Sequence, residues 1–447
     1  MCPTRALLLD LYQLTMAQSY FALSMREPAV FELFVRSLPR SRGFLVAAGL
    51  AQALEYLEGL RFGPEDIKFL AGLGLFSPEF LKYLGTFRFS GSVHAMPEGT
   101  PFFGQEPILR VTAPILEAQV VESRILNIVH FQTVIASKAA RCALAAGERQ
   151  LVDFGLRRAH EADAGFFAAR AAYVGGFHAT ATVEAGLRFG IPLSGTLAHS
   201  FIEAHRSEEE AFRSFAATYP GPVTLLIDTY DTERGAERVA ALARELKKIA
   251  SPRRIRAVRI DSGDLAGECR AVRRILDSLG CQEIQIVVSG GLDEYAIEDL
   301  VKNAAPVDAF GVGTALAVAA DAPALDMAYK LQDYAGKARR KRSPGKATWP
   351  GVKQVFRERG AQRQIVRDAV ALVEDAVPGE ALLVEVMREG HTVAPATPLA
   401  QIRAYCLQEV HALPAPLHDL LQSTGAVPVR ISEALRALAA QLDAEVR

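Results

Sequence analysis

The stretch IRAVRIDSGD, residues 255–264, carries the clearest indication of both fold and chemistry in this chain. Its apolar residues from Ile255 to Ile260, interrupted by Arg256 and Arg259, predict a buried strand. The strand runs into the letters DSGD, which place carboxylates, a hydroxyl and free backbone N–H groups at one edge of a sheet. Such an edge suits the hydroxyls of a sugar, a phosphate or a metal-bound phosphate, although a strand followed by an Asp-containing turn would have the same letters.

From residue 151 onward, short apolar segments alternate with amphipathic, helix-like segments. This alternation predicts parallel strands joined by right-handed crossovers, and seven such strands favour an irregular (β/α) barrel over an open doubly wound sheet. No G-x-G-x-x-G follows the first strand to indicate a dinucleotide fold. The candidate strands are residues 151–155, 171–176, 191–195, 223–228, 255–261, 283–290 and 307–313.

The two ends of the chain have a different pattern. Residues 86–121 alternate in short segments separated by Pro and Gly, which predicts a small antiparallel sheet, and residues 354–369 predict a hairpin. We therefore expect an α/β protein whose barrel packs on a mixed α+β domain built from the N- and C-terminal segments. The expected parts are an N-terminal α+β segment (1–120), the barrel with the active site (121–330) and a C-terminal segment that returns to the N-terminal domain (331–447).

Composition limits the classes of function. The 447 residues carry a formal net charge of −1, so no global basic field indicates nucleic acid. No apolar run reaches the roughly 18–20 residues of a membrane span, and the N-terminal letters MCPTRALLLD do not predict a signal peptide. The five scattered cysteines form no C-x-x-C pair and indicate reduced thiols. We expect a cytoplasmic protein without nucleic-acid or membrane partners.

Polar residues follow each predicted strand, and the carboxyl ends of barrel strands form the active site. Glycine turns at 290–291 and 311–313 follow the last two strands, where barrels often bind phosphate through backbone N–H groups. Carboxylates could hold ribose hydroxyls or Mg²⁺ and arginines could clamp an anion, although βα turns are rich in Gly, Asp and Ser in any case. The other strand-end residues are Asp153, Phe154, Arg157, Arg158, Thr196, His199, Ser200, Asp228, Thr229, Tyr230, Asp231, Arg259, Asp261, Ser262, Asp264 and Ser289.

His199 is the candidate nucleophile or acid/base at neutral pH. His178 and His205 lie nearby in sequence and compete for that role, and a histidine near a strand end is often only a hydrogen-bonded structural residue. The basic segment 336–353 could steer anions toward the mouth of the barrel, or be a solvated loop.

At these residues the chain resembles the nicotinate phosphoribosyltransferases. The matching stretches run almost end to end and in order, which makes the resemblance specific for this family; the related nicotinamide and quinolinate enzymes share the architecture but fewer of these stretches. The stretches are DLYQLTMAQSYF (10–21), FELFVRSLP (31–39), LVDFGLRRAH (151–160), AAYVGGF (171–177), GTLAHSF (195–201), IDTYDT (227–232), RIDSGD (259–264), VSGGLDE (288–294), FGVGT (310–314), YKL (329–331) and PGVKQVFR (350–357).

The resemblance implies an enzyme of NAD salvage that joins nicotinate to C1 of phosphoribosyl pyrophosphate, forming nicotinate mononucleotide and pyrophosphate. It implies Mg²⁺ as cofactor and ATP as co-substrate, with His199 as the residue that is transiently phosphorylated. It also implies a homodimer with shared active sites, in which Phe154 and a Tyr12 from the second copy sandwich the pyridine ring.

The resemblance further assigns roles to residues of the strand ends. His199, Asp261 and Arg259 are the expected catalytic residues, with Arg259 and Asp261 in contact with substrate and ribose. Arg157 is expected near the base and the phosphates, and Lys353 is expected to reach phosphate. The other expected substrate-binding residues are Thr180, Asp228 and Ser262, together with Gly290, Gly291, Gly311 and Gly313, which cradle the 5′-phosphate.

The chain departs from the family pattern in two places. Position 153 is Asp where the family string has Glu, and residues 178–182 read HATAT where the family commonly has DGTSN. Nicotinamide-specific relatives carry an Asp at the position of Ala181, so Ala181 argues against nicotinamide. The same alanine removes a hydroxyl donor to a carboxylate, which leaves Thr180, Thr182 or His178 to compensate.

Other functions stay open from the sequence. A phosphoribosyltransferase for another pyridine base, nicotinamide or quinolinate, would carry much of the same pattern, as would a non-catalytic phosphoribosyl-binding regulator. A Schiff-base aldolase needs a lysine on an interior strand, and none of the seven predicted strands contains one.

Overall fold

The computed structural model describes residues 5–249, 251, 253–420 and 427–445, in two compact units. Unit 1 combines residues 1–137 and 324–447, so both ends of the chain belong to it, and unit 2 is residues 138–323. Residues 1–4, which begin the stretch considered for a signal peptide, lie outside the described part. Within the described part, no helix has the length and apolar character needed to cross a membrane.

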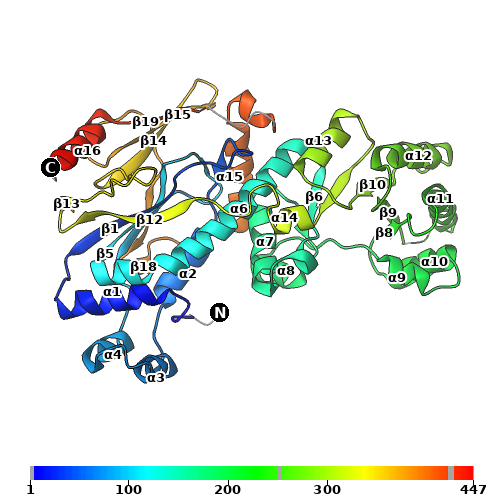
Figure 1. Cartoon of the computed structure of the whole chain (residues 1–447). Helices are drawn as coiled ribbons and strands as arrows, with labels where there is room; N and C mark the ends of the chain where they lie inside the picture. The colour runs from blue at the N-terminus through cyan, green and yellow to red at the C-terminus, as the bar shows by residue number, and fades with distance from the viewer. Residues whose placement is uncertain (1–4, 250, 252, 421–426, 446–447) are drawn as a thin grey trace. The chain divides into compact units, whose positions relative to one another are not determined.

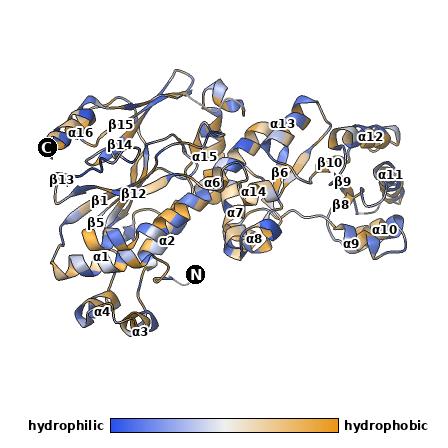
Figure 2. Ribbon diagram, viewed as in Figure 1, coloured by the Kyte–Doolittle hydropathy of each residue, from blue (hydrophilic) through white to orange (hydrophobic). Residues whose placement is uncertain are grey.

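Unit 2 is built on six parallel strands, in the order β7-β6-β11-β10-β9-β8 (Figure 1). Amphipathic helices cover the strands, and Figure 2 shows polar and apolar stretches along them. The strands are β6 (Gln150–Asp153), β7 (Ala179–Thr180), β8 (Val223–Leu226), β9 (Ile255–Ile260), β10 (Gln285–Val288) and β11 (Ala309–Val312). The helices are α7 (Ala162–Val174), α8 (Val183–Phe189), α9 (His199–Glu203), α10 (Glu208–Thr218), α11 (Thr232–Lys248), α12 (Leu265–Ser278), α13 (Glu294–Lys302) and α14 (Thr314–Ala317), with the 3-10 helix η1 (Leu156–Arg158).

Strand β9 confirms the strand predicted at the opening stretch. Its apolar residues are buried, Arg256 is exposed and Arg259 is partly buried. Asp264 ends the stretch as the N-cap of α12, where its carboxylate accepts a hydrogen bond from the Gly267 N–H at 3.2 Å. An aspartate at this position satisfies a backbone donor that the helix cannot, so Asp264 has a structural role.

Two contacts across the parallel sheet show that it is curved. Strands β6 and β9 are separated by two others, so a flat sheet would hold them about 14 Å apart with their side chains roughly perpendicular to it. Instead Arg256 on β9 donates to the Gln150 side chain on β6 at 3.3 Å. The Arg259 guanidinium carbon also lies 5.3 Å from the centre of the Phe154 ring, directly after β6. The sheet is therefore a half-barrel.

Two of the seven strands predicted for the irregular barrel are wrong. Residues 171–174 complete helix α7, because an alanine-rich segment favours helix over strand. Residues 191–195 form only an isolated bridge, between Thr180 and Leu193, next to Pro192, which lacks a backbone donor. Among the described residues, β7 and β8 are thus the edges of the sheet.

Unit 1 contains antiparallel sheets, with strand orders β13-β12-β1-β5-β3-β17-β18, β16-β14-β15-β19 and β2-β4. Among its described residues, only β15 and β19 pair in parallel. The pairs β3–β5 and β14–β15 confirm the sheet and hairpin predicted at 86–121 and 354–369. The strands are β1 (Pro28–Val35), β2 (Leu45–Val46), β3 (Ser92–Ala95), β4 (Pro101–Phe102), β5 (Pro107–Pro114), β12 (Met327–Tyr334), β13 (Lys337–Ala338), β14 (Lys353–Arg359), β15 (Ile365–Leu372), β16 (Glu380–Ala381), β17 (Val384–Arg388), β18 (His391–Thr392) and β19 (Val429–Ile431).

The helices of unit 1 begin with α1, whose N-cap Asp10 and Gln13 form a capping box. Such a box satisfies two backbone donors at the start of a helix and fixes where it begins. The long helix α6 begins in unit 1 and continues into unit 2. The helices are α1 (Leu11–Ala22), α2 (Leu50–Gly59), α3 (Pro64–Gly72), α4 (Pro78–Gly85), α5 (Ile115–Val120), α6 (Glu122–Ala146), α15 (Leu399–His411) and α16 (Glu433–Glu445), with η2 (Ala415–His418).

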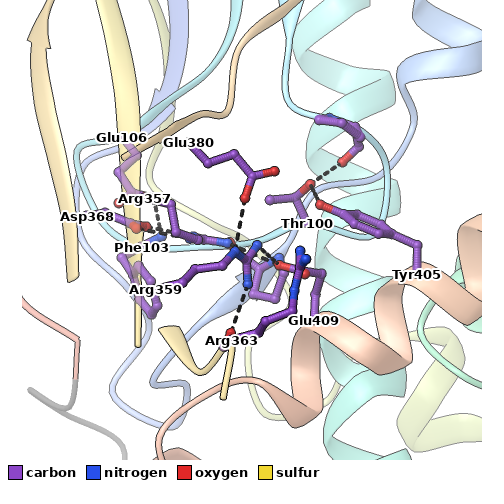
Figure 3. Close-up of polar contacts among 12 residues, drawn as sticks. Thr100, Phe103, Glu106, Arg357, Arg359, Arg363, Asp368, Glu380, Tyr405 and Glu409 are labelled. Carbon is purple, nitrogen blue, oxygen red and sulfur yellow. Dashed lines mark hydrogen bonds and ion pairs between the residues drawn. The ribbon is translucent and has the colours of Figure 1, made fainter. Parts of the chain in front are cut away.

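A buried ionic cluster joins β14, β15 and α15 in unit 1 (Figure 3). The fully buried Arg357 donates to both carboxylate oxygens of Asp368, at 2.9 and 2.6 Å. Arg359 donates to Glu409 at 2.8 Å. Glu106 lies against the same group, where burial and the neighbouring Asp368 carboxylate raise its pKa well above the ordinary value. Burial and the Asp368 carboxylate therefore favour the protonated form of Glu106 in the folded protein.

Replacing Glu106 with Gln should change how stability depends on pH. Because the folded-state pKa is raised, the folded protein binds a proton that the unfolded chain releases above about pH 4.3. Wild-type stability should therefore fall as pH rises from there, by up to about 1.4 kcal/mol per pH unit, and Glu106→Gln should remove this dependence. Urea unfolding between about pH 5 and 8 measures it.

Glu380→Gln is the control for that experiment, because the Glu380 carboxylate belongs to the same cluster but is half-exposed. Its unfolding free energy should follow the wild-type pH profile. Parallel profiles for wild type and Glu106→Gln would contradict the assignment of a proton to Glu106.

Candidate active site

Arg259, near the end of β9, connects several strand ends. Its Nε donates to Ser289 Oγ at 2.7 Å, one terminal nitrogen donates to Thr196 Oγ1 at 3.0 Å, and the other donates to Asp261 Oδ1 at 2.6 Å. Its guanidinium also lies over the Phe154 ring, within the range of a cation–π interaction. A planar guanidinium with fixed donor directions suits this use, because it sets the positions of all its acceptors together.

Asp261 has one carboxylate oxygen bound and the other directed elsewhere. Oδ1 accepts from Arg259 and from the Ser289 hydroxyl, and Oδ2 lies 4.0 Å from His199 Nε2. The Asp261 backbone N–H donates to Asp228 Oδ2 at 2.9 Å, and the Ser262 hydroxyl donates to the same oxygen at 2.7 Å. Two carboxylates from neighbouring strands β8 and β9 are thus held side by side.

His199 begins α9 and faces this pair. Its Nδ1 lies 3.1 Å from the Thr229 hydroxyl, which fixes the orientation of the ring. The side chain is 41% exposed, so Nε2 is reachable from solvent. The competing His205 instead bonds through Nδ1 to the Phe201 carbonyl one helical turn back, at 2.7 Å. Of these two histidines, only His199 joins the strand-end cluster.

Glycine at position 311 makes room for Phe154. A Cβ at Gly311 would lie 2.4 Å from the Phe154 ring, far inside van der Waals contact. Gly311 lies inside β11, so this contact accounts for a glycine there without a ligand. Gly313 lies one residue beyond the end of β11, where a Cβ would meet the Phe154 carbonyl oxygen at 3.4 Å.

The turn after β10 needs glycine for two reasons. Gly290 has φ +90° and Gly291 has φ +64°, a region that other residues rarely adopt. A Cβ on Gly290 would also lie 1.9 Å from the Asp261 carbonyl oxygen, whereas a Cβ on Gly291 would meet open space. Gly290 therefore lets the turn approach the backbone of the residue that carries the central carboxylate.

The segment that departs from the family pattern has specific hydrogen bonds. Thr180 donates its hydroxyl hydrogen to Asp153 Oδ2 at 2.7 Å and accepts from the Thr182 N–H at 3.0 Å, which leaves it no hydrogen for a ligand. His178 Nδ1 accepts from the Leu151 N–H at 3.1 Å. The Thr182 hydroxyl is buried, and no described residue hydrogen-bonds it.

Asp153, at the end of β6, is almost fully buried, and both of its carboxylate oxygens accept hydrogen bonds from the protein. Its second carboxylate oxygen accepts from the Gly155 N–H at 2.8 Å. Burial raises its pKa, and the hydrogen bonds from Thr180 and Gly155 oppose that shift. The carboxylate thus braces the turn that carries Phe154.

Two other expected residues lie on helical segments. Arg157 is exposed on η1 in unit 2. Tyr12 lies on α1 in unit 1 and is half-exposed; burial, together with a hydrogen bond to Glu122, raises the pKa of its hydroxyl.

The expectation that Lys353 reaches phosphate is wrong in this structure. Its ammonium is buried in unit 1, bonded to the Trp349 and Gly351 carbonyls at 2.6 and 2.9 Å and paired with Glu32 at 2.8 Å. A lysine ammonium has three hydrogens, and these three acceptors use all of them.

The sequence listed three residues at strand ends without giving them a role, and the structure shows that they position the cluster. Thr229 orients His199, while Thr196 and Ser289 hold Arg259. Each lies at or directly after the end of a predicted strand, so its place near the cluster could be predicted. Their specific roles depend on distances between strands that sequence does not contain.

Comparisons with known proteins identify the family. Residues 7–130 match the model of the nicotinate phosphoribosyltransferase N-terminal domain, and residues 149–339 match the model of the nicotinate phosphoribosyltransferase family. The chain belongs to the nicotinate phosphoribosyltransferase family. It is 47% identical over 431 residues to nicotinate phosphoribosyltransferase pncB2 of Mycobacterium tuberculosis, covering 96% of this chain and 92% of that protein. It is 32% identical over 518 residues to the human nicotinate phosphoribosyltransferase, covering 97% and 96%.

Solved structures of nicotinate-processing enzymes have the same fold as this chain. The crystal structure of human nicotinic acid phosphoribosyltransferase matches with a TM-score of 0.87 at 29% identity, over 97% of this chain and 100% of that one. A nicotinate-nucleotide pyrophosphorylase from Pyrococcus furiosus matches with a TM-score of 0.74 at 26% identity, over 92% and 96%. The half-barrel with antiparallel sheets is therefore the fold of this enzyme family.

Alanine substitutions at Gly290 and Gly291 should separate the two requirements of the turn. In Gly291→Ala, only the positive φ disfavours the new residue, and the free energy of unfolding should fall by about 1–2 kcal/mol. In Gly290→Ala, the new Cβ also clashes with the Asp261 carbonyl oxygen, so the free energy of unfolding should fall by about 1–3 kcal/mol more. Urea denaturation measures both. Equal costs would show that the turn does not depend on close approach to Asp261.

Proposed function

We propose that this chain is a cytoplasmic nicotinate phosphoribosyltransferase of NAD salvage, which makes nicotinate mononucleotide with ATP as co-substrate. The observation that carries the proposal is that Arg259, Asp261 and His199 meet at the carboxyl ends of the parallel strands, beside the turn at Gly290–Gly291. Membership of the family gives the reaction class, and the half-barrel strands contain no lysine for Schiff-base chemistry. The described cysteines are free, as in a reducing compartment.

The proposed transfer step needs positioning and charge more than acid–base catalysis. The lone pair of the nicotinate ring nitrogen forms a bond to C1 of phosphoribosyl pyrophosphate, while the bond from C1 to the pyrophosphate oxygen breaks and pyrophosphate leaves with the electron pair. Positive charge develops on the ribose ring. Asp261 Oδ2, which neither Arg259 nor Ser289 binds, can stabilise that charge.

Residues around Asp228 fit a magnesium ion that arrives with the pyrophosphate. Asp228 Oδ1 is buried and has no hydrogen-bond partner among the described residues, while Oδ2 accepts from the Asp261 N–H and the Ser262 hydroxyl. No cluster of three or more His, Cys, Asp or Glu side chains in the described residues could hold a metal by itself. That suits Mg²⁺, which usually binds one or two carboxylates together with substrate phosphates. When bound, it would offset phosphate charge.

His199 is proposed to carry phosphate from ATP. If Nδ1–H donates to Thr229, the Nε2 lone pair is free to bond the γ-phosphorus as the bond to ADP breaks. Water then releases phosphate from the phosphohistidine, and that free energy favours formation of the mononucleotide. The exposure of His199 and its distance from Asp261 support this role.

One assay tests the function and the role of His199 together. Wild type with nicotinate, phosphoribosyl pyrophosphate, Mg²⁺ and ATP should give mononucleotide and ADP. His199→Ala should lose ATP stimulation and keep slow transfer, whereas His205→Gln should keep both. If wild type gives no product with nicotinate, nicotinamide or quinolinate, the proposed enzymatic function is wrong and a phosphoribosyl-binding regulator is favoured. If His199→Ala still couples transfer to ATP hydrolysis, another residue carries the phosphate.

Thr182 is proposed to donate to the nicotinate carboxylate, because Thr180 and His178 Nδ1 are already bonded within the protein. Thr182→Val should raise the KM for nicotinate about tenfold, as expected for a hydrogen bond to a charged group, with little loss of stability. Ala181→Asp should admit nicotinamide if this segment selects the base. An unchanged KM for nicotinate in Thr182→Val would contradict the assignment.

We further propose a homodimer in which the partner's Tyr12 closes over the base stacked on Phe154. The half-exposed ring of Tyr12 is available for such a contact. Tyr12→Ala and Phe154→Ala should each be nearly inactive. Mixing and re-assembling the two variants should restore about a quarter of wild-type activity, since half the dimers are mixed and each has one intact site. No gain over the separate variants would contradict shared sites.

A further inference from the structure

The two glycine turns lie at the ends of neighbouring strands, because β10 and β11 pair in the sheet. A phosphate held by backbone N–H groups from both turns needs them at a fixed separation. Glycine cannot supply that rigidity by itself, since it has the largest conformational freedom of any residue. The separation must therefore be set by residues outside the turns.

A buried ionic network in unit 2 connects the segments that follow both turns. The Lys138 ammonium, on α6, binds a carboxylate oxygen of Glu294, which comes three residues after Gly291. The same ammonium lies 3.0 Å from Asp321 Oδ1, eight residues after Gly313. One lysine thus links the two segments.

Arg141, one turn further along α6, completes the network. Its Nε donates to the second oxygen of Glu294 at 3.0 Å, and its terminal nitrogen donates to the Tyr295 hydroxyl at 2.9 Å. Both oxygens of Glu294, the first residue of α13, are therefore fixed to α6. The network balances two cations against two carboxylates.

The network is almost inaccessible to water. The side chains of Lys138 and Glu294 are 1% and 0% exposed, and that of Asp321 is 8% exposed. Burial favours a neutral lysine, but the Glu294 and Asp321 carboxylates outweigh it and raise the pKa of Lys138. Displacing either segment would separate opposite charges in a medium of low polarity, which is strongly unfavourable. Lys138 therefore resists changes in the spacing of the turns.

Buried ion pairs seldom add net stability over well-packed apolar residues, and their best-attested use is to select one arrangement. We propose that Lys138 is a positioning residue for the sugar-phosphate substrate: it holds the two glycine turns at the spacing that binds the 5′-phosphate. This inference rests on the proposed function. Lys138 acts through Glu294 and Asp321, since its own ammonium is bonded to them and is buried.

The test is the double variant Lys138→Met/Glu294→Gln in the full chain, which removes the central pair without leaving Glu294 charged. The KM for phosphoribosyl pyrophosphate and the dissociation constant of ribose 5-phosphate should each rise about tenfold, while the KM for nicotinate stays within about twofold. Lys138→Arg, which keeps the charge, should recover part of the affinity.

The matched control is Arg357→Met/Asp368→Asn, which removes an equally buried pair in unit 1. It should leave both sugar-phosphate constants unchanged, even where it lowers the melting temperature. A folded Lys138→Met/Glu294→Gln with wild-type affinity for both sugar phosphates would overturn the inference, as would an equal loss in the control. Failure of the wild type to bind ribose 5-phosphate would instead reject the proposed function.

Discussion

The guanidinium of Arg259 is the constraint on which the site depends. It meets a hydroxyl after β10, a hydroxyl beyond β7, the carboxylate that follows its own strand and the aromatic ring after β6. These groups come from segments far apart in the chain. They can meet one side chain only because the parallel sheet is curved, so the half-barrel and the Arg259 contacts require each other.

The contacts that anchor Asp261 and Asp228 use only one carboxylate oxygen of each residue. Asp261 is anchored through one oxygen, so its other oxygen is directed toward His199. Asp228 is anchored through one oxygen to the residue that follows the next strand, and no residue in the described part of the chain bonds its other oxygen. Each carboxylate therefore has one oxygen bonded within the protein and one that is proposed to serve the reaction. This division explains how charged groups can be fixed before substrate arrives, which is the preorganisation that transition-state stabilisation needs.

Much of this could be predicted from sequence, because strand periodicity and strand-end position are local properties. The strand predicted at 255–260 is confirmed, and the polar residues predicted to meet at its carboxyl end do contact one another. The strand at 171–176 was predicted wrongly because a short apolar run fits helix and strand equally. The strand at 191–195 was predicted wrongly because Pro192 lacks a backbone donor, which leaves only an isolated bridge. The bonded hydroxyl of Thr180 and the link from Lys138 to two turns depend on three-dimensional contacts, which no local pattern encodes.

The most direct test of the account compares Arg259→Lys with wild type by kcat/KM for phosphoribosyl pyrophosphate and by urea unfolding. Lysine keeps the charge but cannot bind three acceptors in one plane. The account predicts a loss in kcat/KM of about 100-fold or more, with the folded structure retained. A folded Arg259→Lys enzyme with kcat/KM within about threefold of wild type would contradict it.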